Sequence, residues 1–214
     1  VAVVSGQTVT IADAASNADP GVTVTYYFVI TNTGNAAESF NYTISGPPCD
    51  YSTASLDRGD SEIVEVSHTV ATDAAADSTS TVTLTTCDST SGSKSDTATT
   101  TANQIYGVTI FQTGGSEPST INPGEIFDIS YTVTNTGNGA DSVSVSFNAG
   151  WLSGTSGTSL SLASGATGTA TATLTVPNDA AGSSSSSISA LATGSASSGS
   201  SGSYSMSVNP TSRS

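Results

Sequence analysis

The chain is poor in the residues on which most binding and catalytic chemistry depends. Its 214 residues include three basic side chains (Arg58, Lys94 and Arg213), one His, two Cys and one Trp, against 17 acidic side chains, so the formal net charge is −14. Such a surface repels phosphate backbones and anionic membranes, and we therefore expect no nucleic acid as a partner. No apolar run approaches the roughly 18 residues of a membrane-spanning helix, so no membrane span is predicted.

Catalytic patterns are equally scarce. His68 is the only imidazole, and it alternates outward in an expected strand. The sequence has no Gly-x-Ser-x-Gly elbow, Walker loop or dinucleotide fingerprint. The carboxylate pairs Glu62/Glu65 and Asp57/Asp60 have the residue types of a glycosidase, but nothing around them resembles such an active site. We expect no enzymatic activity.

What the chain does have is alternation of apolar and polar residues with a period of two, and it has no stripe at the helical period. About seven such segments in each half, separated by Gly, Asn, Pro and Ser, predict an all-β fold. The expected inward positions are Val22, Val24, Tyr26, Phe28, Ile30, Phe40, Tyr42, Ile44, Ile63, Val64, Val66, Thr69, Val70, Val82 and Leu84 in the first half, and Phe127, Ile129, Tyr131, Val133, Val143, Val145, Phe147, Ala172, Leu174, Val176, Ile188, Ala190, Ala192, Tyr204, Met206 and Val208 in the second.

The alternating pattern occurs twice. Residues 19–35 run from Asp-Pro-Gly to Thr-Asn-Thr-Gly-Asn, and residues 122–138 repeat this order without a gap. The spacing is about the length of one immunoglobulin-type sandwich, roughly 100 residues. We predict two tandem Ig-like (Greek-key) β-sandwich domains, 1–103 and 104–214. The Asn-Thr-Gly-Asn tetrads are expected to form tight turns because Asn and Gly accept positive φ, and Pro-Gly is likewise a turn signal.

Both cysteines lie in the first half. Cys49 follows one expected strand and Cys87 ends a later one, and such strands are neighbours in many sandwiches. We predict a Cys49–Cys87 disulfide in the first domain, which implies an oxidising compartment; two reduced, buried thiols are the alternative. A metal site built from the two Cys and His68 lacks the necessary ligand count.

Acidic residues offer candidate calcium ligands. Asp57, Asp60 and Glu62, or Asp13 with Asp19, supply oxygen ligands near expected turns. The spaced Asp-x-Asp-x-Asp-Gly pattern of a calcium loop is absent, and solvated acidic loops are the default interpretation. No cofactor is therefore assigned.

Three further motifs suggest contacts outside the cell. Asn41-Tyr42-Thr43 is a glycosylation sequon whose Asn41 faces outward between inward neighbours. Trp151 has the side chain to stack on a sugar, although an aromatic residue in this position is more often core. Residues 58–60 spell Arg-Gly-Asp, an integrin-type tripeptide that also serves simply as a turn.

The segment 182–203 is dominated by Ser and Gly. Two interpretations remain open from the sequence: a flexible linker, or a final hairpin whose outer face carries small side chains. The alternation on both sides of the segment supports the hairpin.

Five stretches of the second half form a recognisable series: 123–124, 131–138, 151–152, 160–165 and 174–182. In these residues the second half resembles bacterial and archaeal Ig-like modules of the CARDB and NPCBM-associated type. Ser164 stands where the family usually has Pro, and residues 55–60 and 71–76 match the same corners less well. The resemblance implies the sandwich fold, and it implies roles as spacers, adhesin stalks, enzyme accessories or surface-filament subunits.

These observations favour a secreted structural subunit of a cell-surface assembly. With no Met at its start and no signal-like segment before Val1, the chain is expected to be a mature extracellular product. We predict a homopolymeric, pilus-like filament built by strand donation, in which Val1, Ala2, Val3 and Val4 complete a neighbour's sheet. The same four residues could instead be the first strand of their own domain. The alternative function is a carbohydrate-associated or adhesin spacer module that contacts surface glycans.

Overall fold

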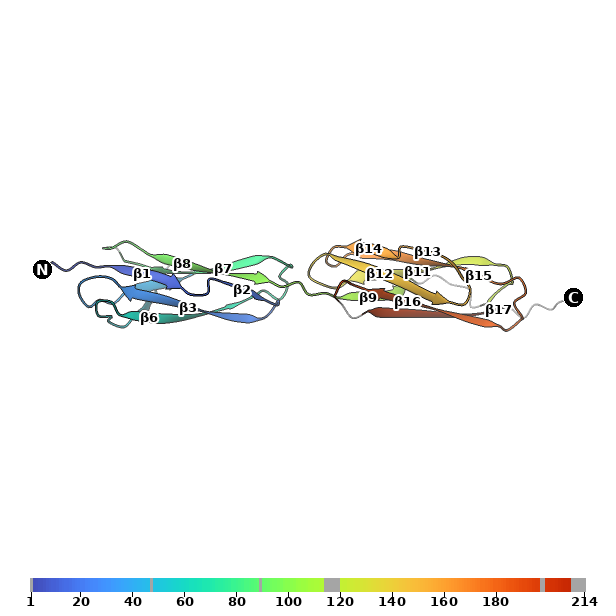
Figure 1. Cartoon of the computed structure of the whole chain (residues 1–214), viewed down its shortest axis with the longest axis horizontal. Coiled ribbons are helices and arrows are strands. Elements are labelled where there is room, and N and C mark those ends of the chain that lie inside the picture. Colours follow the sequence, from blue (N-terminus) through green and yellow to red (C-terminus); the bar gives the residue numbers. More distant parts are fainter. Residues whose placement is uncertain (1, 47, 89, 114–119, 197–198, 209–214) are drawn as a thin grey trace. The chain divides into compact units, whose positions relative to one another are not determined.

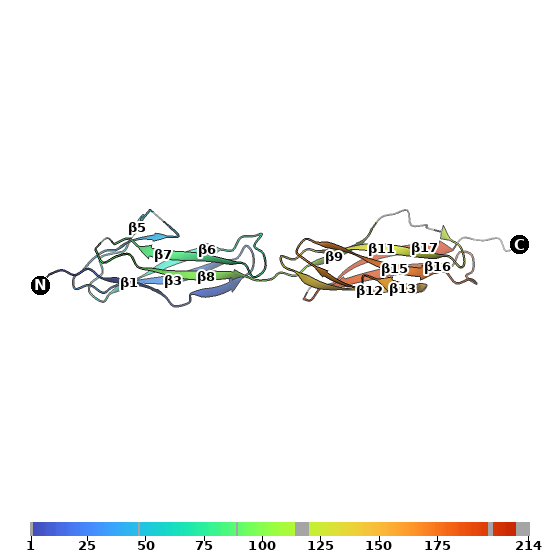
Figure 2. The same ribbon diagram turned by 90° about the horizontal axis from the view of Figure 1, so that it is seen from above.

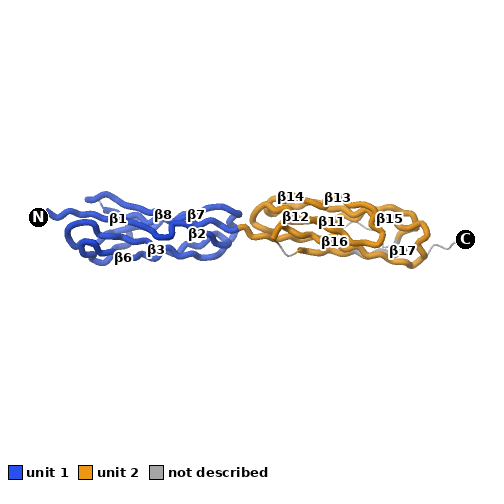
Figure 3. Tube along the Cα trace, in the orientation of Figure 1, with its two compact units in different colours: residues 1–103 blue, residues 104–214 orange. Residues whose placement is uncertain are grey.

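The protein is described by a computed structural model that is entirely β. The structure describes residues 2–46, 48–88, 90–113, 120–196 and 199–208, and no helix occurs among them. The chain divides into two compact units, Val1–Asn103 and Gln104–Ser214 (Figure 3). Each unit has its own two sheets and its own hydrophobic core, as an Ig-like β-sandwich requires.

Unit 1 is built from a three-stranded sheet in the order β1-β3-β6 and a five-stranded sheet in the order β2-β8-β7-β4-β5 (Figure 1). Neighbours are antiparallel except β2 and β8, which run parallel. The chain changes sheets between β3 and β4 and again between β6 and β7, as in an immunoglobulin fold. The strands are β1 (Gln7–Ile11), β2 (Ala15–Ala18), β3 (Thr23–Asn32), β4 (Asn41–Ile44), β5 (Tyr51–Ser52), β6 (Ser61–Thr69), β7 (Thr79–Thr86) and β8 (Ser95–Ala102).

Unit 2 repeats this plan with one strand more among the described residues. Its sheets have the orders β13-β15-β11-β9 and β10-β17-β16-β12-β14, and β10 runs parallel to β17 as β2 does to β8. The strands are β9 (Val108–Gln112), β10 (Thr120–Ile121), β11 (Ile126–Asn135), β12 (Asp141–Ala149), β13 (Leu152–Ser156), β14 (Ser159–Leu162), β15 (Thr167–Thr175), β16 (Ser185–Thr193) and β17 (Ser200–Val208).

The period-two pattern places the apolar side chains between the two sheets of each unit, and it confirms the predicted fold class. On β3 and β11 every second residue is enclosed, because successive side chains of a strand point to opposite faces. Burying such aliphatic and aromatic side chains contributes about 1.5–3 kcal/mol each. The enclosed residues of the two strands are Tyr26, Phe28, Ile30, Ile129, Tyr131 and Val133.

Three residues predicted to face the core are exposed: Val22, Ile63 and Thr69. Val22 is 45% exposed, because it lies in the turn before β3 begins. Ile63 is 66% exposed, since it alternates with the buried Val64 on β6 and therefore lies on the outer face. Thr69 has the same outward phase on β6 as Ile63. The prediction was wrong for all three.

Both Pro-Gly turns are confirmed. Gly21 and Gly124 have φ of +83° and +82°, a conformation that glycine adopts without a steric penalty. The hairpin interpretation of the Ser-rich segment is confirmed as well, because β16 and β17 pair antiparallel from Ser185↔Ser207 to Ala192↔Ser200. The predicted inward orientation of Tyr204, Met206 and Val208 lies outside what the structure describes.

Candidate assembly site

Unit 1 is organised around a buried asparagine at the end of its longest strand. Asn32 stays on the inner side of β3 and is fully enclosed. Its Nδ2 donates to Leu56 O (2.8 Å) and Ala36 O (2.9 Å), and its Oδ1 accepts from Gly34 N (2.8 Å). One side chain thus ties three main-chain groups of the corner together. Leu56 O also accepts from Glu38 N, and Gly34 N also donates to Gly6 O.

Unit 2 contains the same arrangement. Asn135 ends β11, is fully enclosed, and donates from Nδ2 to Gly139 O (2.8 Å) and Leu162 O (2.9 Å). Its Oδ1 accepts from Gly137 N at 2.9 Å. No residue in 32–35 or 135–138 has a positive φ, so the predicted reason for the tetrads was wrong. The tetrads are corners held by asparagine side chains.

The second asparagine of the first corner holds the opening segment of the chain. Asn35 Oδ1 accepts from Val4 N (2.8 Å), and Asn35 Nδ2 donates to Ala2 O (2.8 Å). Asn35 N also donates to Val4 O at 3.1 Å. A Cβ on Gly34 would lie 2.6 Å from Val4 O, so glycine is needed for this close approach.

The second corner holds Ile105, which stands just after the boundary of the two units, in the same way. Ile105 N donates to Asn138 Oδ1 (2.7 Å), and Asn138 N donates to Ile105 O (3.1 Å). Gln104 Nε2 adds a hydrogen bond to Ala140 O at 2.8 Å. Each corner is therefore a socket for the main chain that enters its unit.

The predicted assembly strand lies in the first of these sockets. β1 begins only at Gln7, so the described residues Ala2–Val4 are not a strand of their own sheet, and Val1 lies outside the described residues. The side chains of Val3 and Val4 are 76% and 61% exposed. Donation of this segment to another copy stays a prediction.

A second contact holds the opening segment. Ser5 Oγ lies 2.7 Å from Glu38 Oε2 and 3.1 Å from Asp88 Oδ2. Asp88 also accepts from the Ser91 hydroxyl, from Ser91 N (2.9 Å) and from Thr90 N (2.7 Å). These hydrogen bonds, that of the Ser91 hydroxyl foremost, lower the pKa of Asp88 to about 2.

We expect acid to weaken this contact. The folded pKa of Asp88 lies below its ordinary value of 3.8, so its stabilising effect is fully present above that value and is lost as the pH falls toward 2. Asp88→Asn should therefore reduce the loss of thermal stability of unit 1 between pH 4 and 2, by about 2 °C for a half-buried group that solvent still screens. Thermal unfolding at a series of pH values measures this effect. Asp73→Asn, in an exposed turn, is the control; equal pH profiles for the two variants would contradict the prediction.

The outer edge of β6 is open, whereas the corresponding edge of unit 2 is covered. β6 pairs with β3 on one side, and no described strand pairs with its other side. In unit 2, β15 occupies the place of β6, and β13 pairs with its outer edge from Leu152↔Leu174 to Ser156↔Thr171. Among the described residues, unit 1 therefore lacks a strand that unit 2 possesses.

The route of the chain before β6 explains the difference. In unit 1 this connection stays on the other sheet, where β5 (labelled in Figure 2) pairs with β4. Leu56 then forms a bridge with Glu38. The Cys49–Cys87 disulfide, with its Cα atoms 6.3 Å apart, joins the connection to the residue that follows β7. In unit 2 the connection has no cysteine. Its first part forms β13, which pairs with β15, and its second part forms β14, which pairs with β12.

The open edge of β6 carries apolar, acidic and small polar side chains. In an antiparallel pair, alternate residues of a strand direct their N–H and C=O groups to the partner strand, and the residues between them direct these groups away. Asp60 O accepts from Asn32 N, so the even-numbered residues of β6 bond to β3. The main-chain groups of Ile63, Glu65 and Ser67 therefore point to the open side. All three side chains are exposed. Glu62, in contrast, accepts from Ala54 N at 2.8 Å near the start of the edge.

The carboxylates that were candidate acids and bases do not come together. Glu62 and Glu65 lie on opposite faces of β6, and Glu62 is half-buried. Asp60 N donates to Asp57 O, which closes a turn with Gly59 at φ +88°. Within the described residues no group of three or more His, Cys, Asp or Glu side chains is arranged to hold a metal ion.

The Arg-Gly-Asp tripeptide occupies a turn that the second unit builds from other residues. Gly165 has φ +72°, and Ala166 N donates to Ala163 O at 3.0 Å, as in the turn around Gly59. The residues in place of Arg58-Gly59-Asp60 are Ser164-Gly165-Ala166. The tripeptide is accounted for by its turn.

The remaining candidates have local roles or stay predictions. His68 was predicted to point outward, but it follows Val64 and Val66 in the inward phase of β6 and is half-buried, so this prediction was wrong. Its Nε2 lies 2.7 Å from Ser80 Oγ of β7. Trp151 is half-buried against the core of unit 2. Asn41 is exposed at the start of β4, while the Thr43 of its sequon is buried with its hydroxyl on Gly46 O. An exposed Asn41 is compatible with a glycan, and its glycosylation stays a prediction.

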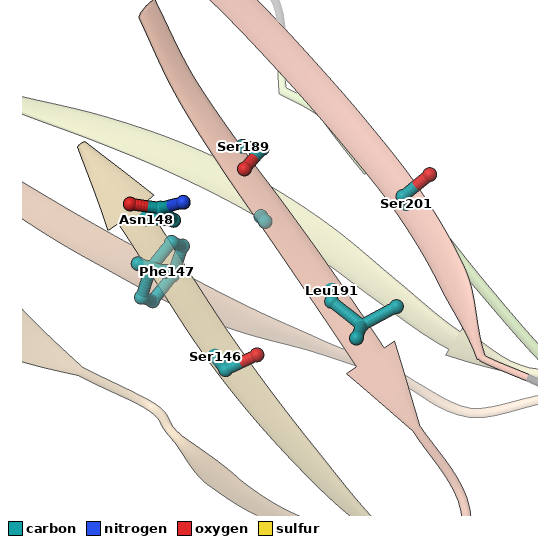
Figure 4. A pocket seen from close by; sticks show the side chains of 7 residues that line it. Ser146, Phe147, Asn148, Ser189, Leu191 and Ser201 are labelled. Atoms are coloured by element: carbon teal, nitrogen blue, oxygen red, sulfur yellow. The ribbon is translucent and has the colours of Figure 1, made fainter.

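Unit 2 has a shallow depression of about 300 Å³ on the outer face of β12, β16 and β17 (Figure 4). The labelled side chains on its surface are mostly small and polar, among them Ser146, Ser189 and Ser201, and Leu191 is 45% exposed. None of the seven lining residues is charged, so the depression has no acid or base for catalysis.

Comparison with known proteins supports the fold. No protein-family model matches the chain, and no curated protein matches it. The extracellular cadherin domains 1–4 of protocadherin gamma B7 match with a TM-score of 0.50 and 14% identity, over 96% of this chain and 51% of that one. Native alpha-2-macroglobulin of Escherichia coli matches with a TM-score of 0.36 and 11% identity, over 95% of this chain and 17% of that one.

A protein of unknown function from Porphyromonas gingivalis W83 matches with a TM-score of 0.33 and 14% identity, over 86% of this chain and 92% of that one. The chain thus spans about half of the protocadherin chain and less than a fifth of the macroglobulin. At 14% identity the protocadherin likeness shows the fold alone, tandem β-sandwich domains. No helix capable of crossing a bilayer occurs among the described residues.

Proposed function

We propose that the chain is a secreted structural subunit of a cell-surface assembly, whose copies join into an extracellular filament by strand donation. The observation that carries the proposal is the open edge of β6, in a unit whose twin covers the same edge with β13. An unfilled sheet edge binds an extended segment through main-chain hydrogen bonds. Because donor and acceptor are different surfaces of one chain, the contact does not close on itself and it propagates.

Two further observations support an extracellular structural role. The Cys49–Cys87 disulfide is of a kind that persists in oxidising compartments. The resemblance of residues 123–182 to CARDB and NPCBM-associated modules points to surface proteins and filament subunits. The proposal includes no enzymatic step and no cofactor, and the dispersed candidate carboxylates are in keeping with it.

A carbohydrate-associated or adhesin spacer is the second candidate. It rests on the same resemblance and on Trp151, which is half-buried rather than fully enclosed and so leaves part of its ring accessible. Binding to a glycan array that is lost on Trp151→Ala would favour this function.

The proposed function is tested by concentrating the 214-residue chain and imaging it in negative stain. We expect filaments, together with oligomers in size-exclusion chromatography that grow with concentration. A variant that lacks residues 1–6 should stay monomeric, because it has lost the donor segment. A full-length chain that stays monomeric at high concentration, or a shortened variant that forms the same filaments, would overturn the proposal.

A further inference from the structure

We propose that Asn35 is a latch: it holds the donor segment Ala2–Gly6 on its own unit, and the open edge of β6 in a second copy binds this segment only after the latch opens. This inference rests on the proposed strand donation and adds the acceptor edge, its register and the regulation. It follows from the contacts of the donor segment and from the strand that unit 2 supplies.

The latch and the acceptor edge compete for the same main-chain groups. Ala2 O, Val4 N and Val4 O are all bonded to Asn35. Gly34 lies so close to Val4 O that even one additional carbon atom would collide with it. No second backbone can approach Val4 from this side while the segment is held. Pairing with β6 through Val4 therefore requires the hydrogen bonds to Asn35 to break.

Unit 2 shows the geometry of a filled edge. β13 has five residues, runs antiparallel to β15, and receives a hydrogen bond from Thr175 N to Trp151 O at 2.9 Å just before its first residue. The donor segment Ala2–Gly6 has the same length. We infer an antiparallel register in which Val4 faces Glu65, the central residue of β6.

Apolar contacts favour this register. With Val4 opposite Glu65, the Val4 side chain lies on the outer face of the β1-β3-β6 sheet, diagonal to Ile63. Ile63 is 66% exposed. Tyr27 lies on β3 directly opposite Glu65 and is 54% exposed. Docking of the segment would cover part of this apolar surface, which the monomer leaves in water.

The open edge of β6 could pair with the donor segment or with the β6 edge of another copy, and charge favours the donor segment. Two β6 edges in antiparallel contact would bring their Glu65 carboxylates together, and like charges facing each other across strands are destabilising. The donor segment has no carboxylate, since Asp13 is the first acidic residue of the chain. In a chain with a net charge of −14, pairing of the donor segment with β6 therefore brings no two carboxylates together.

Crosslinking of the double variant Val4→Cys/Glu65→Cys tests the acceptor. The native cysteines are joined to each other, so a short bismaleimide will react with the introduced thiols. We expect a ladder of crosslinked dimers and higher oligomers from the 214-residue chain. Val4→Cys/Thr10→Cys, with the second thiol exposed on the opposite edge strand of the sheet, should give no ladder of crosslinked oligomers.

Two matched asparagine variants test the latch. Asn35→Ala in the crosslinking background should raise the initial rate of crosslinking about tenfold, because it removes the two side-chain hydrogen bonds to Ala2 O and Val4 N and leaves only the main-chain bonds of Val4 O and Gly6 O and the Ser5 contact to hold the segment. Asn138→Ala removes the same contact from Ile105 without freeing the donor, so its rate should equal that of the parent. A third variant, Ser67→Pro, removes an N–H from the open side of β6 but leaves the pairing with β3, and it should abolish the ladder.

The results separate the latch from the filament. Filaments without a Val4–Glu65 crosslink, or equal rates for Asn35→Ala and Asn138→Ala, would overturn this inference and leave the proposed function standing. A monomeric chain that shows no crosslink even with Asn35→Ala would overturn both. A crosslinked ladder accelerated by Asn35→Ala supports both, and it does so even if Ser67→Pro fails to fold.

Discussion

Replacement of Cys49 and Cys87 by Ser is expected to lower the free energy of unfolding of unit 1 by about 4 kcal/mol, the chain-entropy value for a loop of this length. The two cysteines are 38 residues apart, so the disulfide removes much conformational freedom from the unfolded chain. It also holds the connection between β4 and β6 on the β4 side. Because domains have total free energies of unfolding of about 5–15 kcal/mol, unit 1 should become only marginally stable.

Urea unfolding followed by two probes measures this loss. Trp151 is the only Trp and packs against the core of unit 2, so its fluorescence reports unit 2 alone, while far-UV circular dichroism reports both units. The variant should show an earlier transition by circular dichroism and an unchanged one by fluorescence. A fluorescence midpoint that moves equally would contradict the assignment of the effect to unit 1.

Asn135→Ala is expected to lower the free energy of unfolding of unit 2 by about 3 kcal/mol, because buried groups that lose their partners cost about 1–3 kcal/mol each. The substitution removes the side-chain partner of Gly137 N, Gly139 O and Leu162 O; of these, Leu162 O also takes part in the β12–β14 pairing. Asn135 is fully enclosed, so bulk solvent does not reach these groups in the folded unit. The Trp151 fluorescence midpoint in urea measures the loss directly.

Asn138→Ala is the matched control for this prediction. Asn138 lies three residues further along the same corner, and its bond to Ile105 is exposed, so water can replace it. Its loss should cost less than about 1 kcal/mol. A larger effect for Asn138→Ala than for Asn135→Ala would show that the corner is held by its outer contact with the entering chain.

The alternation of apolar and polar residues and the internal repeat predicted most of the fold. Phe28 and Ile129 were predicted inward from their neighbours alone, because a strand with one buried face must alternate. Pro-Gly was a reliable turn signal, since only a few residue types accept the φ of Gly21. Even the buried asparagines could have been recognised, because Asn32 continues the inward phase of Ile30.

Side-chain roles and edge pairing were harder to predict. The Asn-Thr-Gly-Asn tetrad was ascribed to positive φ, whereas its asparagines bond to main-chain groups up to 33 residues away. Ile63 was misplaced because two apolar residues in succession, Ile63 and Val64, leave the phase of a strand ambiguous. A one-residue shift reverses the face of every side chain, and only packing resolves it.

The sequence by itself determined the all-β class, the repeat and the positions of most core residues, because these follow from the local period of the chain. It also identified the two cysteines of the disulfide. Only the tertiary structure decided that the opening segment lies in the Asn35 socket and that β6 has an open edge where β15 is paired with β13. Both depend on which distant segments meet. Two halves with nearly the same local pattern can therefore differ in whether the outer edge of the corresponding strand is paired, as β15 is and β6, among the described residues, is not.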